Sequence, residues 1–469
     1  MNRVGDWQAF LDIPARSSSP SPSLCSGSGS RGGRGVRPYT IKESRSFLSM
    51  TYFYWITGII LALAWVSRIV DAALGMPSVA DVSKPDWDRN PVSPSGNPRV
   101  SIIVPARNEE QTIEQALRTL LALDYDNYEV IAVNDRSTDR TGEIMERVAR
   151  SQTTKSTLCG PPSKVESPDS HFSQNQGEVG HPTLPRLRVI HHTELPAGWL
   201  GKTHAMWTAA NQASGDWLLF TDADVLFKPD SVRRALAYAE AEPADHVVLF
   251  PRMIMKRPGE YMMIAFFQTM FMFGHRPWKV ADPSTDDHMG VGAFNFVRRR
   301  VYDAIGTYEA LRMEVLDDMK LGKVVKKAGF AQRNVFGGDL ISIRWAHGAF
   351  GIVNNLTKNF FAVLSFQSWR TLLSAFALAF INLGPFFGTW LVHGWARLPF
   401  AVALGSMLLI YVGMSWRSGV PPYYFLLHPV STGLFIYTLL RSMVLTLWND
   451  GIVWRGTKYP LEELRKGMV

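Results

Sequence analysis

Apolar runs separated by polar loops recur between residues 99 and 350, and apolar residues at helical spacing follow several of them. After the first run, the apolar positions Ile113, Leu117 and Leu120 repeat on one face of a predicted helix. The repeated order of strand, polar loop and helix predicts right-handed crossovers and a parallel sheet. We therefore expect an α/β domain. The expected strands are residues 99–105, 128–133, 187–190, 217–220 and 247–250, with a further turn and strand in 290–297.

Longer apolar stretches lie on both sides of this region. Residues 46–67 carry no charged side chain and have aromatic residues near both ends. Such a helix can cross a hydrocarbon core of about 30 Å, with its aromatic residues at the two interfaces. A cleaved signal peptide is the alternative, but the run is longer than a usual signal core and has no clear cleavage site. About three further spans are expected, in residues 371–392, 398–416 and 423–448.

These patterns predict the organisation of the whole chain. Residues 151–185 are rich in Ser, Pro and Gly and lack periodicity, so we expect a disordered insertion there. Met50 precedes the first apolar stretch and is a possible alternative start of the native protein. The expected segments are a disordered basic tail (1–45), a transmembrane helix (46–70), a linker (71–98), a catalytic domain (99–350), an interfacial amphipathic helix (351–370), about three transmembrane helices (371–448) and a basic tail (449–469).

The orientation in the membrane contains a conflict. A cytoplasmic domain followed by three spans would place the C-terminal tail outside, yet that tail is basic, which favours the inside. We give more weight to the basic tail, so that one span is re-entrant or the number of spans differs. The expectation is a multi-pass protein of the inner (plasma) membrane with a cytoplasmic catalytic domain.

Composition and charge narrow the class of protein. Hydrophobic residues make up 46% of the chain, which is more than one soluble core needs and fits a membrane protein. About half of the formal net charge of +8 lies in residues 1–45, so no basic domain indicates nucleic-acid binding. The only two cysteines, Cys25 and Cys159, lie in polar stretches and support neither a disulfide framework nor a cysteine metal site.

Two carboxylates follow the buried strand at 217–220. Asp222 and Asp224 are two residues apart, so that both can face one pocket from the end of the strand. Hard oxygen donors at that edge of a parallel sheet suit Mg²⁺ or Mn²⁺ holding a diphosphate. A capped turn or a solvated loop is the alternative. Lys202, at the end of a glycine-flanked loop, would supply a second positive charge, since no P-loop or dinucleotide fingerprint is present.

An acidic pair and an apolar helix can each be interpreted either as part of a functional site or as purely structural. Asp317 and Asp318 begin a predicted helix, where acidic residues can serve only to complement the helix dipole. Residues 258–280 form an apolar helix rich in Met and Phe. This helix is either part of the core or one wall of an acceptor groove near the membrane.

Five motifs occur together in an order that resembles family 2 glycosyltransferases of the GT-A fold. Within that family the chain is most similar to membrane-bound enzymes that glycosylate lipids, such as the hopanoid-associated and carotenoid glycosyltransferases. Ceramide glucosyltransferase is a more distant relative. The ending Trp454–Tyr459 is also similar to the ending of those proteins. The five motifs are Val104–Glu110, Asn134–Asp139, Gly198–Lys202, Thr221–Asp224 and Asp317-Asp318-x-x-Leu321.

The resemblance implies a Rossmann-like, mixed but mostly parallel sheet and a set of site residues. Pro105, Arg107, Glu109, Asp135, Lys202 and Asp222 would bind a nucleotide-sugar donor, expected to be UDP-linked. Asp224 would ligate Mg²⁺ or Mn²⁺. Asp318 would be the general base of an inverting displacement, with Asp317 as the second candidate. Trp454 and Arg455 would lie at the acceptor side or interface.

One departure from the wider family bears on the acceptor. Processive polysaccharide synthases and ceramide glucosyltransferase carry a Gln-x-x-Arg-Trp motif after the base, whereas Ile341 precedes Arg344 and Trp345 here. Residues 340–345 are also expected to form a strand and not an interfacial helix. The expected function is therefore transfer of one sugar to a lipid acceptor. A processive polysaccharide synthase and an inactive glycosyltransferase-like scaffold are the alternatives.

Overall fold

The structure is a computed structural model that describes residues 41–91, 96–158 and 186–468. The chain divides into two compact units, residues 1–50 and 51–469. In the first unit only the start of helix α1 (Ile41–Gly75) is described, so most of the expected tail over 1–45 lies outside the described residues. The expected insertion at 151–185 is also mostly outside them, but its first residues continue helix α3 (Thr141–Leu158).

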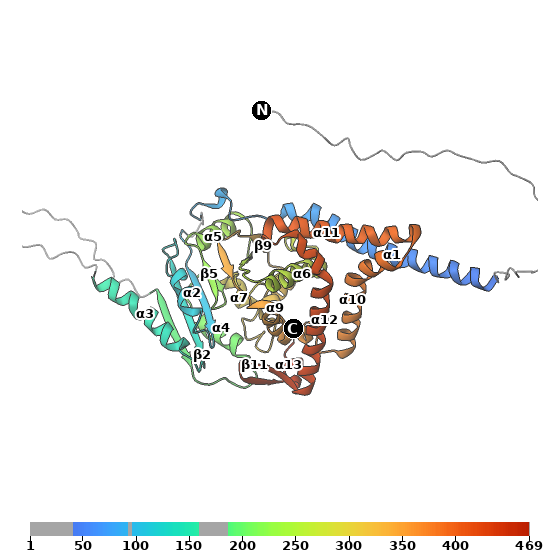
Figure 1. Cartoon of the computed structure of the whole chain (residues 1–469). Helices are drawn as coiled ribbons and strands as arrows, with labels where there is room; N and C mark the ends of the chain where they lie inside the picture. Colours follow the sequence, from blue (N-terminus) through green and yellow to red (C-terminus); the bar gives the residue numbers. More distant parts are fainter. Residues whose placement is uncertain (1–40, 92–95, 159–185, 469) are drawn as a thin grey trace, which may run out of the picture. The chain divides into compact units, whose positions relative to one another are not determined.

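A seven-stranded mixed sheet forms the centre of the second unit (Figure 1). Four of its neighbouring pairs are parallel, and only β8 runs against its neighbours β4 and β6. The mostly parallel α/β sheet expected from the sequence is therefore confirmed. In spatial order the strands are β3 (Leu187–His192), β2 (Tyr128–Asp135), β1 (Val100–Ala106), β4 (Trp217–Phe220), β8 (Asn295–Arg298), β6 (His246–Phe250) and β9 (Gln332–Phe336).

Helices cover both faces of this sheet, which explains why its strands β1, β4 and β6 are mostly apolar. Ile102 and Val104 of β1 face a core shared with α2 (Ile113–Leu120), α3 and α5 (Ser231–Ala241). Ile103, between them, faces the opposite core, because successive side chains of a strand alternate between faces. That second core is formed with α4 (Gly201–Gln212), α7 (Arg299–Ala304) and α8 (Asp317–Lys327).

A second, three-stranded sheet joins the domain to the apolar helices. It consists of β5 (Val225–Phe227), β10 (Ile341–Ile343) and β7 (Arg252–Met253). Directly after β10, Arg344 forms a 2.8 Å ion pair with the buried carboxylate of Glu260 in α6 (Pro258–Gly274). The same carboxylate accepts a hydrogen bond of 2.9 Å from the backbone N–H of Gly348, where α9 (Gly348–Val363) begins. Glu260 therefore links α6 both to Arg344 and to the start of α9, and β10 forms where a strand was expected.

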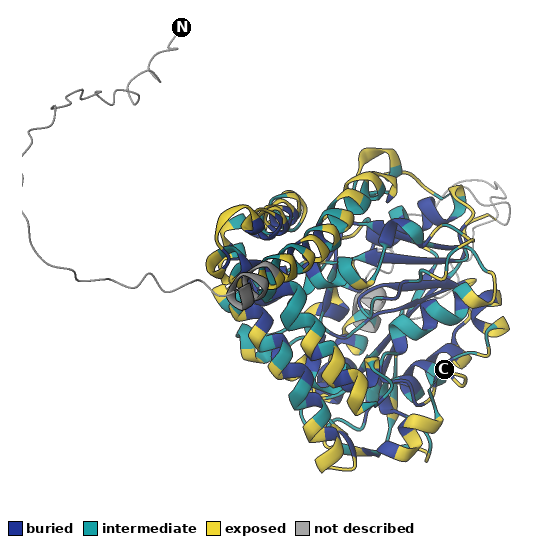
Figure 2. Cartoon of the chain, turned by 90° about the vertical axis from the view of Figure 1, so that its right-hand side faces the viewer, coloured by how far each residue is buried: buried dark blue, intermediate teal, exposed yellow. Residues whose placement is uncertain are grey.

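In the part of the chain that the structure describes, four helical segments are long and apolar enough to cross a membrane, as judged by length and composition. Figure 1 shows α10 (Ser368–Leu391) and α12 (His428–Trp448) running alongside one another, while α1 and α11 (Leu398–Ser418) run across them. Many large apolar residues of these helices are exposed. Figure 2 colours the exposed residues of the ribbon yellow. Apolar N-terminal and C-terminal helices flanking the domain, as the sequence predicts, are thereby confirmed. The candidate spans are Ser49–Ser78, Ser368–Leu391, Gly394–Ser418 and Pro422–Trp448.

The chain ends in a small hairpin that packs on the catalytic domain. Strands β11 (Gly451–Trp454) and β12 (Thr457–Pro460) pair antiparallel and are followed by α13 (Leu461–Lys466). Ile452 and Leu464 share an apolar core with Leu200 and Val315 of the catalytic domain and with Phe361 of α9. The end of the chain therefore lies against the domain from which the candidate spans depart.

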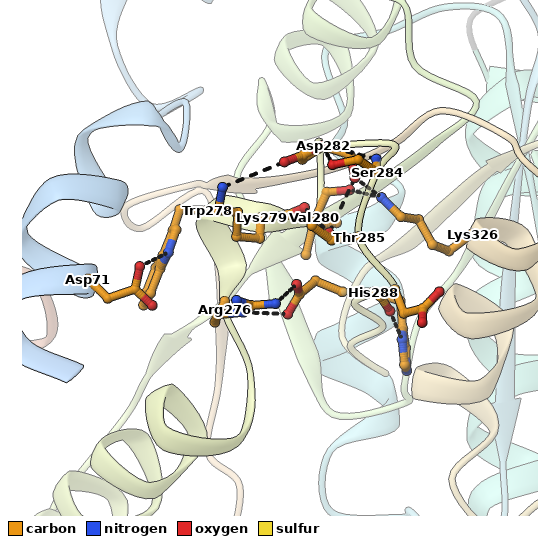
Figure 3. A network of polar contacts seen from close by, with 12 residues as sticks. Asp71, Arg276, Trp278, Lys279, Val280, Asp282, Ser284, Thr285, His288 and Lys326 are labelled. Atoms are coloured by element: carbon orange, nitrogen blue, oxygen red, sulfur yellow. Dashed lines mark hydrogen bonds and ion pairs between the residues drawn. The ribbon is translucent and has the colours of Figure 1, made fainter. Parts of the chain in front are cut away.

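A network of polar contacts holds the segment between α6 and β8 (Figure 3). The indole Nε1 of Trp278 donates a 3.2 Å hydrogen bond to Asp71 of α1, and Arg276 forms two hydrogen bonds to Asp287. Lys326, at the end of α8, donates to the carbonyl oxygens of Val280 and Asp282. These contacts fix the course of the chain just before Gly290, which leads into the candidate site.

Candidate active site

The carboxyl ends of three neighbouring parallel strands bring the first site residues together. β1 lies between β2 and β4 in parallel register. Arg107 and Glu109 therefore follow β1 at the same edge where Asp135 ends β2 and Asp222 follows β4. This edge of an open α/β sheet is where ligands bind.

Lys202 lies between two of the predicted carboxylates. Its Nζ atom is 2.9 Å from Oδ1 of Asp222 and 3.3 Å from Oδ2 of Asp317. Burial alone would lower the pKa of Lys202, but the charges of Asp222 and Asp317 outweigh burial and raise it. Burial would likewise raise the pKa of Asp222, and the charge of Lys202 overcomes this and lowers it. Lys202 and Asp222 are therefore ionised at neutral pH, as a charged donor site requires.

Asp318 and Asp317 have different surroundings, although they are adjacent in sequence. Asp317 is buried, 5% exposed, and paired with Lys202. Asp318 is only half-buried, and its carboxylate accepts hydrogen bonds from the backbone N–H groups of Gly292 (2.9 Å) and Met319 (2.8 Å). Burial raises the pKa of both carboxyls, that of Asp317 to about 6. Of the two, Asp318 is the one that an acceptor can reach.

Glycines at 290 and 292 allow this close approach. A Cβ atom at Gly290 would overlap the backbone carbonyl of Asp318, and one at Gly292 would lie 2.5 Å from Oδ2 of Asp222. Side chains at these positions would push the two carboxylates apart. The sequence shows a glycine-rich turn here, but its role is visible only in the structure.

The surroundings of Asp224 fit a carboxylate that could bind a metal ion. Burial, followed by the charges of Asp222 and Glu109, raises the pKa of Asp224 to about 7. Among the described residues no cluster of three or more His, Cys, Asp or Glu side chains could hold a metal by itself. Mg²⁺ in phosphate-binding sites uses one or two carboxylates and takes its other ligands from the phosphates and water. The carboxylate oxygen atoms of the site therefore fit a divalent cation that also binds a diphosphate.

Asp135 is held at the bottom of the donor loops. Its carboxylate is 3% exposed and accepts hydrogen bonds of 2.8 and 3.0 Å from the guanidinium group of Arg136. Arg107 lies 3.8 Å from the same carboxylate. Pro105 lines the adjoining cavity from the end of β1. All six residues expected to bind the donor therefore surround one space, with Arg136 as an additional member that sequence reasoning did not single out.

The C-terminal hairpin reaches the donor loops. Arg455 forms an ion pair with Glu109 and donates a hydrogen bond to the carbonyl oxygen of Arg107. The Tyr459 hydroxyl accepts a 3.2 Å hydrogen bond from the backbone N–H of Gly201, at the start of α4. Arg455 thus contacts the loop after β1, and its expected place at the acceptor side or interface stays a prediction.

Lys358 of α9 lies beside the C-terminal hairpin. Its Nζ atom lies 3.7 Å from the ring centroid of Trp454. Sequence reasoning placed Lys358 on an amphipathic surface helix and did not assign it to the site. The signal in the sequence that could have identified Lys358 was its position as a single cation beside several phenylalanines.

One cavity connects these residues with the apolar helices. It has a volume of about 2700 Å³ and is lined by Asp222, Asp224, Asp317 and Asp318. Its lining also includes side chains of α6, among them Phe267, Met270 and Phe271, and of the candidate spans α10, α11 and α12. Met263 and Phe266 of α6 are instead buried in a core. The helix at 258–274 is therefore both a core element and one wall of the cavity.

The catalytic region matches a known family. Residues 101–158 and 180–306 match the model of glycosyl transferase family 2. This region therefore resembles family 2 glycosyltransferases. The five motifs quoted above lie within it or directly after it, and the mostly parallel sheet agrees with the GT-A fold.

Similar proteins extend the comparison. A 4,4'-diaponeurosporenoate glycosyltransferase of Staphylococcus haemolyticus is 22% identical over 54% of this chain and 58% of its own length. A beta-monoglucosyldiacylglycerol synthase of Synechocystis is 24% identical over 58% of this chain and 49% of its own length. The chain thus spans about half the length of these curated relatives. A mannosyltransferase from Pyrobaculum calidifontis, solved with GDP-Man and Mn²⁺, superposes with a TM-score of 0.48 at 18% identity, covering 85% of this chain and 99% of that chain.

Proposed function

We propose that the protein is a membrane-bound, metal-dependent, inverting glycosyltransferase that moves one sugar from a nucleotide donor to a lipid acceptor. The observation that carries the proposal is the single cavity lined both by the four carboxylates and by the apolar helices. A lipid whose apolar part lies among these helices can present its polar group to Asp318. The names of the relatives, which describe transfer to a carotenoid acid and the synthesis of a glycolipid, agree with this acceptor class.

The donor site has the charges that a nucleoside diphosphate requires. Lys202 faces the place where the diphosphate would lie, and Asp224 would hold Mg²⁺ or Mn²⁺ against it. The bound cation supplies Lewis-acid neutralisation of the leaving group. Asp135, with Arg107 and Arg136 around it, would bind the base, for which we propose uracil, and Asp222 would lie near the ribose.

Asp318 then acts on the acceptor. Its carboxylate takes the proton from an acceptor hydroxyl while that oxygen forms a bond to the anomeric carbon of the sugar. The bond from this carbon to the diphosphate oxygen breaks in the same step, so the configuration is inverted. Gly292 and Met319 keep the carboxylate in place through their N–H groups, which is the positioning that general base catalysis needs.

The position of the C-terminal hairpin supports a proposal for the membrane topology. The hairpin packs on the catalytic domain, and we propose that both lie on the same side of the membrane. An even number of complete crossings is then required between residues 368 and 448, although three segments there are long enough to cross. The basic tail supports the cytoplasmic side of the plasma membrane for both.

The direct test is mass spectrometry of lipid extracts from a deletion strain complemented with the wild type or with Asp318→Asn. We expect one glycolipid, heavier than its precursor by a single sugar, to be absent without complementation and with the variant. If lipids are unchanged and an exported polysaccharide is lost, a processive polysaccharide synthase replaces this proposal.

A processive synthase and an inactive scaffold have less support than a lipid glycosyltransferase. Arg344 is held by Glu260 and Trp345 packs against Phe267, so the Arg-Trp pair is engaged with α6. An inactive scaffold would bind the donor without turnover. Hydrolysis of the nucleotide sugar by the purified protein with Mn²⁺, and its loss in Asp318→Asn, would exclude the scaffold.

A further inference from the structure

A lysine from outside the matched domain enters the active-site cavity. Lys358 belongs to α9, and α9 is packed on α12: the Ser442 hydroxyl accepts a 2.9 Å hydrogen bond from the N–H of Phe361. On its other side Lys358 contacts the ring of Trp454 in the C-terminal hairpin. The amine therefore lies between α9, to which it belongs, and the C-terminal hairpin, and both of these elements connect directly with the apolar helices.

The two cations of this cavity differ in their partners. Lys202 is paired with Asp222 and Asp317. Lys358 makes no ion pair in the part of the chain that the structure describes, and it contacts the face of Trp454. An indole ring attracts a cation but does not neutralise it, so the amine keeps its capacity to bind an anion.

The surrounding charges agree with an anion site. Lys358 is close enough to Asp222 and Asp317 to be stabilised by them, and close enough to Lys202 and Arg455 to be repelled. Burial, followed by the repulsion from Lys202, lowers the pKa of Lys358 to about 8. An anion placed between Lys358 and Lys202 would relieve this repulsion and compensate for the burial of the amine.

We propose that Lys358 is an anion-binding residue of the active site, receiving either a phosphate of the donor's diphosphate or an anionic group of the acceptor. The inference rests on the proposed function, because it assumes that a nucleotide sugar and an acceptor share this cavity. Trp454 acts as a positioning residue that keeps the amine directed into the cavity. The shared chemistry is an oxyanion, and the two sources can be separated by experiment.

Three variants of the full-length protein in nanodiscs test the proposal. Lys358→Met keeps the apolar stem and its contact with Trp454 but removes the charge. Lys358→Arg keeps a cation that also stacks on aromatic rings. Lys323→Met, which changes a lysine of α8 that lines the same cavity, is the matched control. The measurements are the affinity for UDP with Mn²⁺ by calorimetry and the KM values for donor and acceptor.

If the anion is a phosphate of the donor, Lys358→Met should weaken UDP binding by about 10- to 100-fold, the effect of losing one charged hydrogen bond. If it belongs to the acceptor, UDP affinity should be unchanged and the KM for the acceptor should rise by a similar factor. In either case Lys358→Arg should restore most of the loss, and Lys323→Met should resemble the wild type.

The proposal is overturned if Lys358→Met changes neither quantity more than Lys323→Met does. It is also overturned if Lys358→Arg impairs UDP affinity or the acceptor KM as much as Lys358→Met does, because a positive charge at this position would then not be sufficient for binding the anion. Thermal unfolding of each variant identifies losses caused by misfolding, and the arginine variant remains informative if the methionine variant is unstable. A wild-type protein that binds UDP and transfers sugar while Lys358→Met is unaffected contradicts this inference alone. A wild type without either activity contradicts the proposed function.

Discussion

Nζ of Lys202 lies 2.9 Å from Oδ1 of Asp222, so a cation and an anion of the candidate site are paired with each other. The pair joins α4 to the loop after β4, the strand that follows α4 in the chain. If the proposed donor binds here, its diphosphate would compete with Asp222 and Asp317 for this amine, and the exchange of one anion for another would keep the lysine charged.

Lys202→Met should weaken binding of a nucleoside diphosphate by about 10- to 100-fold, because one charge-assisted contact is lost. It should also leave Asp222 and Asp317 without their shared partner. Calorimetry with UDP and Mn²⁺ measures the first effect. Lys228→Met, which breaks the exposed pair with Asp339, is the control and should bind like the wild type. Equal affinities of Lys202→Met and Lys228→Met would refute the assignment.

Asp224→Asn should abolish Mn²⁺-dependent transfer but stabilise the protein in the absence of metal. The pKa of Asp224 is raised to about 7, so the folded state holds this proton more tightly than the unfolded chain. Ionisation of Asp224 therefore destabilises the fold above about pH 7, and this loss disappears as the pH falls below about 4. Above about pH 8 the variant should be more stable by on the order of 1 kcal/mol, after allowance for screening by water.

The stability effect is measured by thermal unfolding with a chelator present. The difference between Asp224→Asn and the wild type should shrink toward acidic pH, where Asp224 of the wild type is itself neutral. A variant that is less stable than the wild type above about pH 8 would contradict the assigned charge environment.

Asp318→Asn should lower kcat by about 10²- to 10⁴-fold, the usual range for loss of a general base. Because burial raises the pKa of Asp318, wild-type kcat should begin to fall at a higher pH than an ordinary aspartate would cause, as this carboxylate takes up a proton. Burial also raises the pKa of Asp317, to about 6. Asp317→Asn should mainly raise the donor KM, since Asp317 pairs with Lys202. A larger loss of kcat in Asp317→Asn than in Asp318→Asn would reverse the two roles.

Arg455→Met should raise the donor KM about 3- to 10-fold with little change in kcat, because Arg455 holds the loop of Arg107 and Glu109. The effect is moderate since the pair is partly exposed. Lys458→Met, on the next strand of the same hairpin, is the control and should leave the donor KM unchanged. A change in the acceptor KM alone would place Arg455 on the acceptor side.

His428→Phe should destabilise the apolar helices by about 1 kcal/mol. The imidazole of His428 lies 3.0 Å from the Tyr411 hydroxyl and 2.9 Å from the side-chain oxygen of Asn382, so it connects α12 to α11 and α10. Thermal unfolding in detergent measures the loss. Tyr437→Phe, at an exposed position of α12, is the control and should have little effect. Equal stability of both variants would mean that the three side chains contribute no net stabilisation.

Much of the fold could be predicted because its determinants are local in sequence. The strand at 100–106 is mostly apolar and the strand at 128–135 is mostly apolar up to Val133, since helices cover both faces of the sheet, and the polar loops follow them directly. The long apolar stretches around residues 49–78 and 368–448, which carry few charged residues, are recognisable by their length. Asp222, Asp224, Asp317 and Asp318 were recognisable because each pair is contiguous or nearly so in the chain.

The sequence by itself determined the mostly parallel α/β domain, the apolar flanking helices and the carboxylates of the site, because these depend on periodicity and short motifs. Only the tertiary structure decided that Lys202 pairs with Asp222 and Asp317, and that Gly290 and Gly292 make room for two carboxylates. It also decided that Lys358 contacts Trp454, that Arg455 contacts Arg107 and Glu109, and that Tyr459 contacts the start of α4. These contacts join residues up to several hundred positions apart, and no local pattern encodes such a distance because it results from the packing of α9, α12 and the hairpin against the domain.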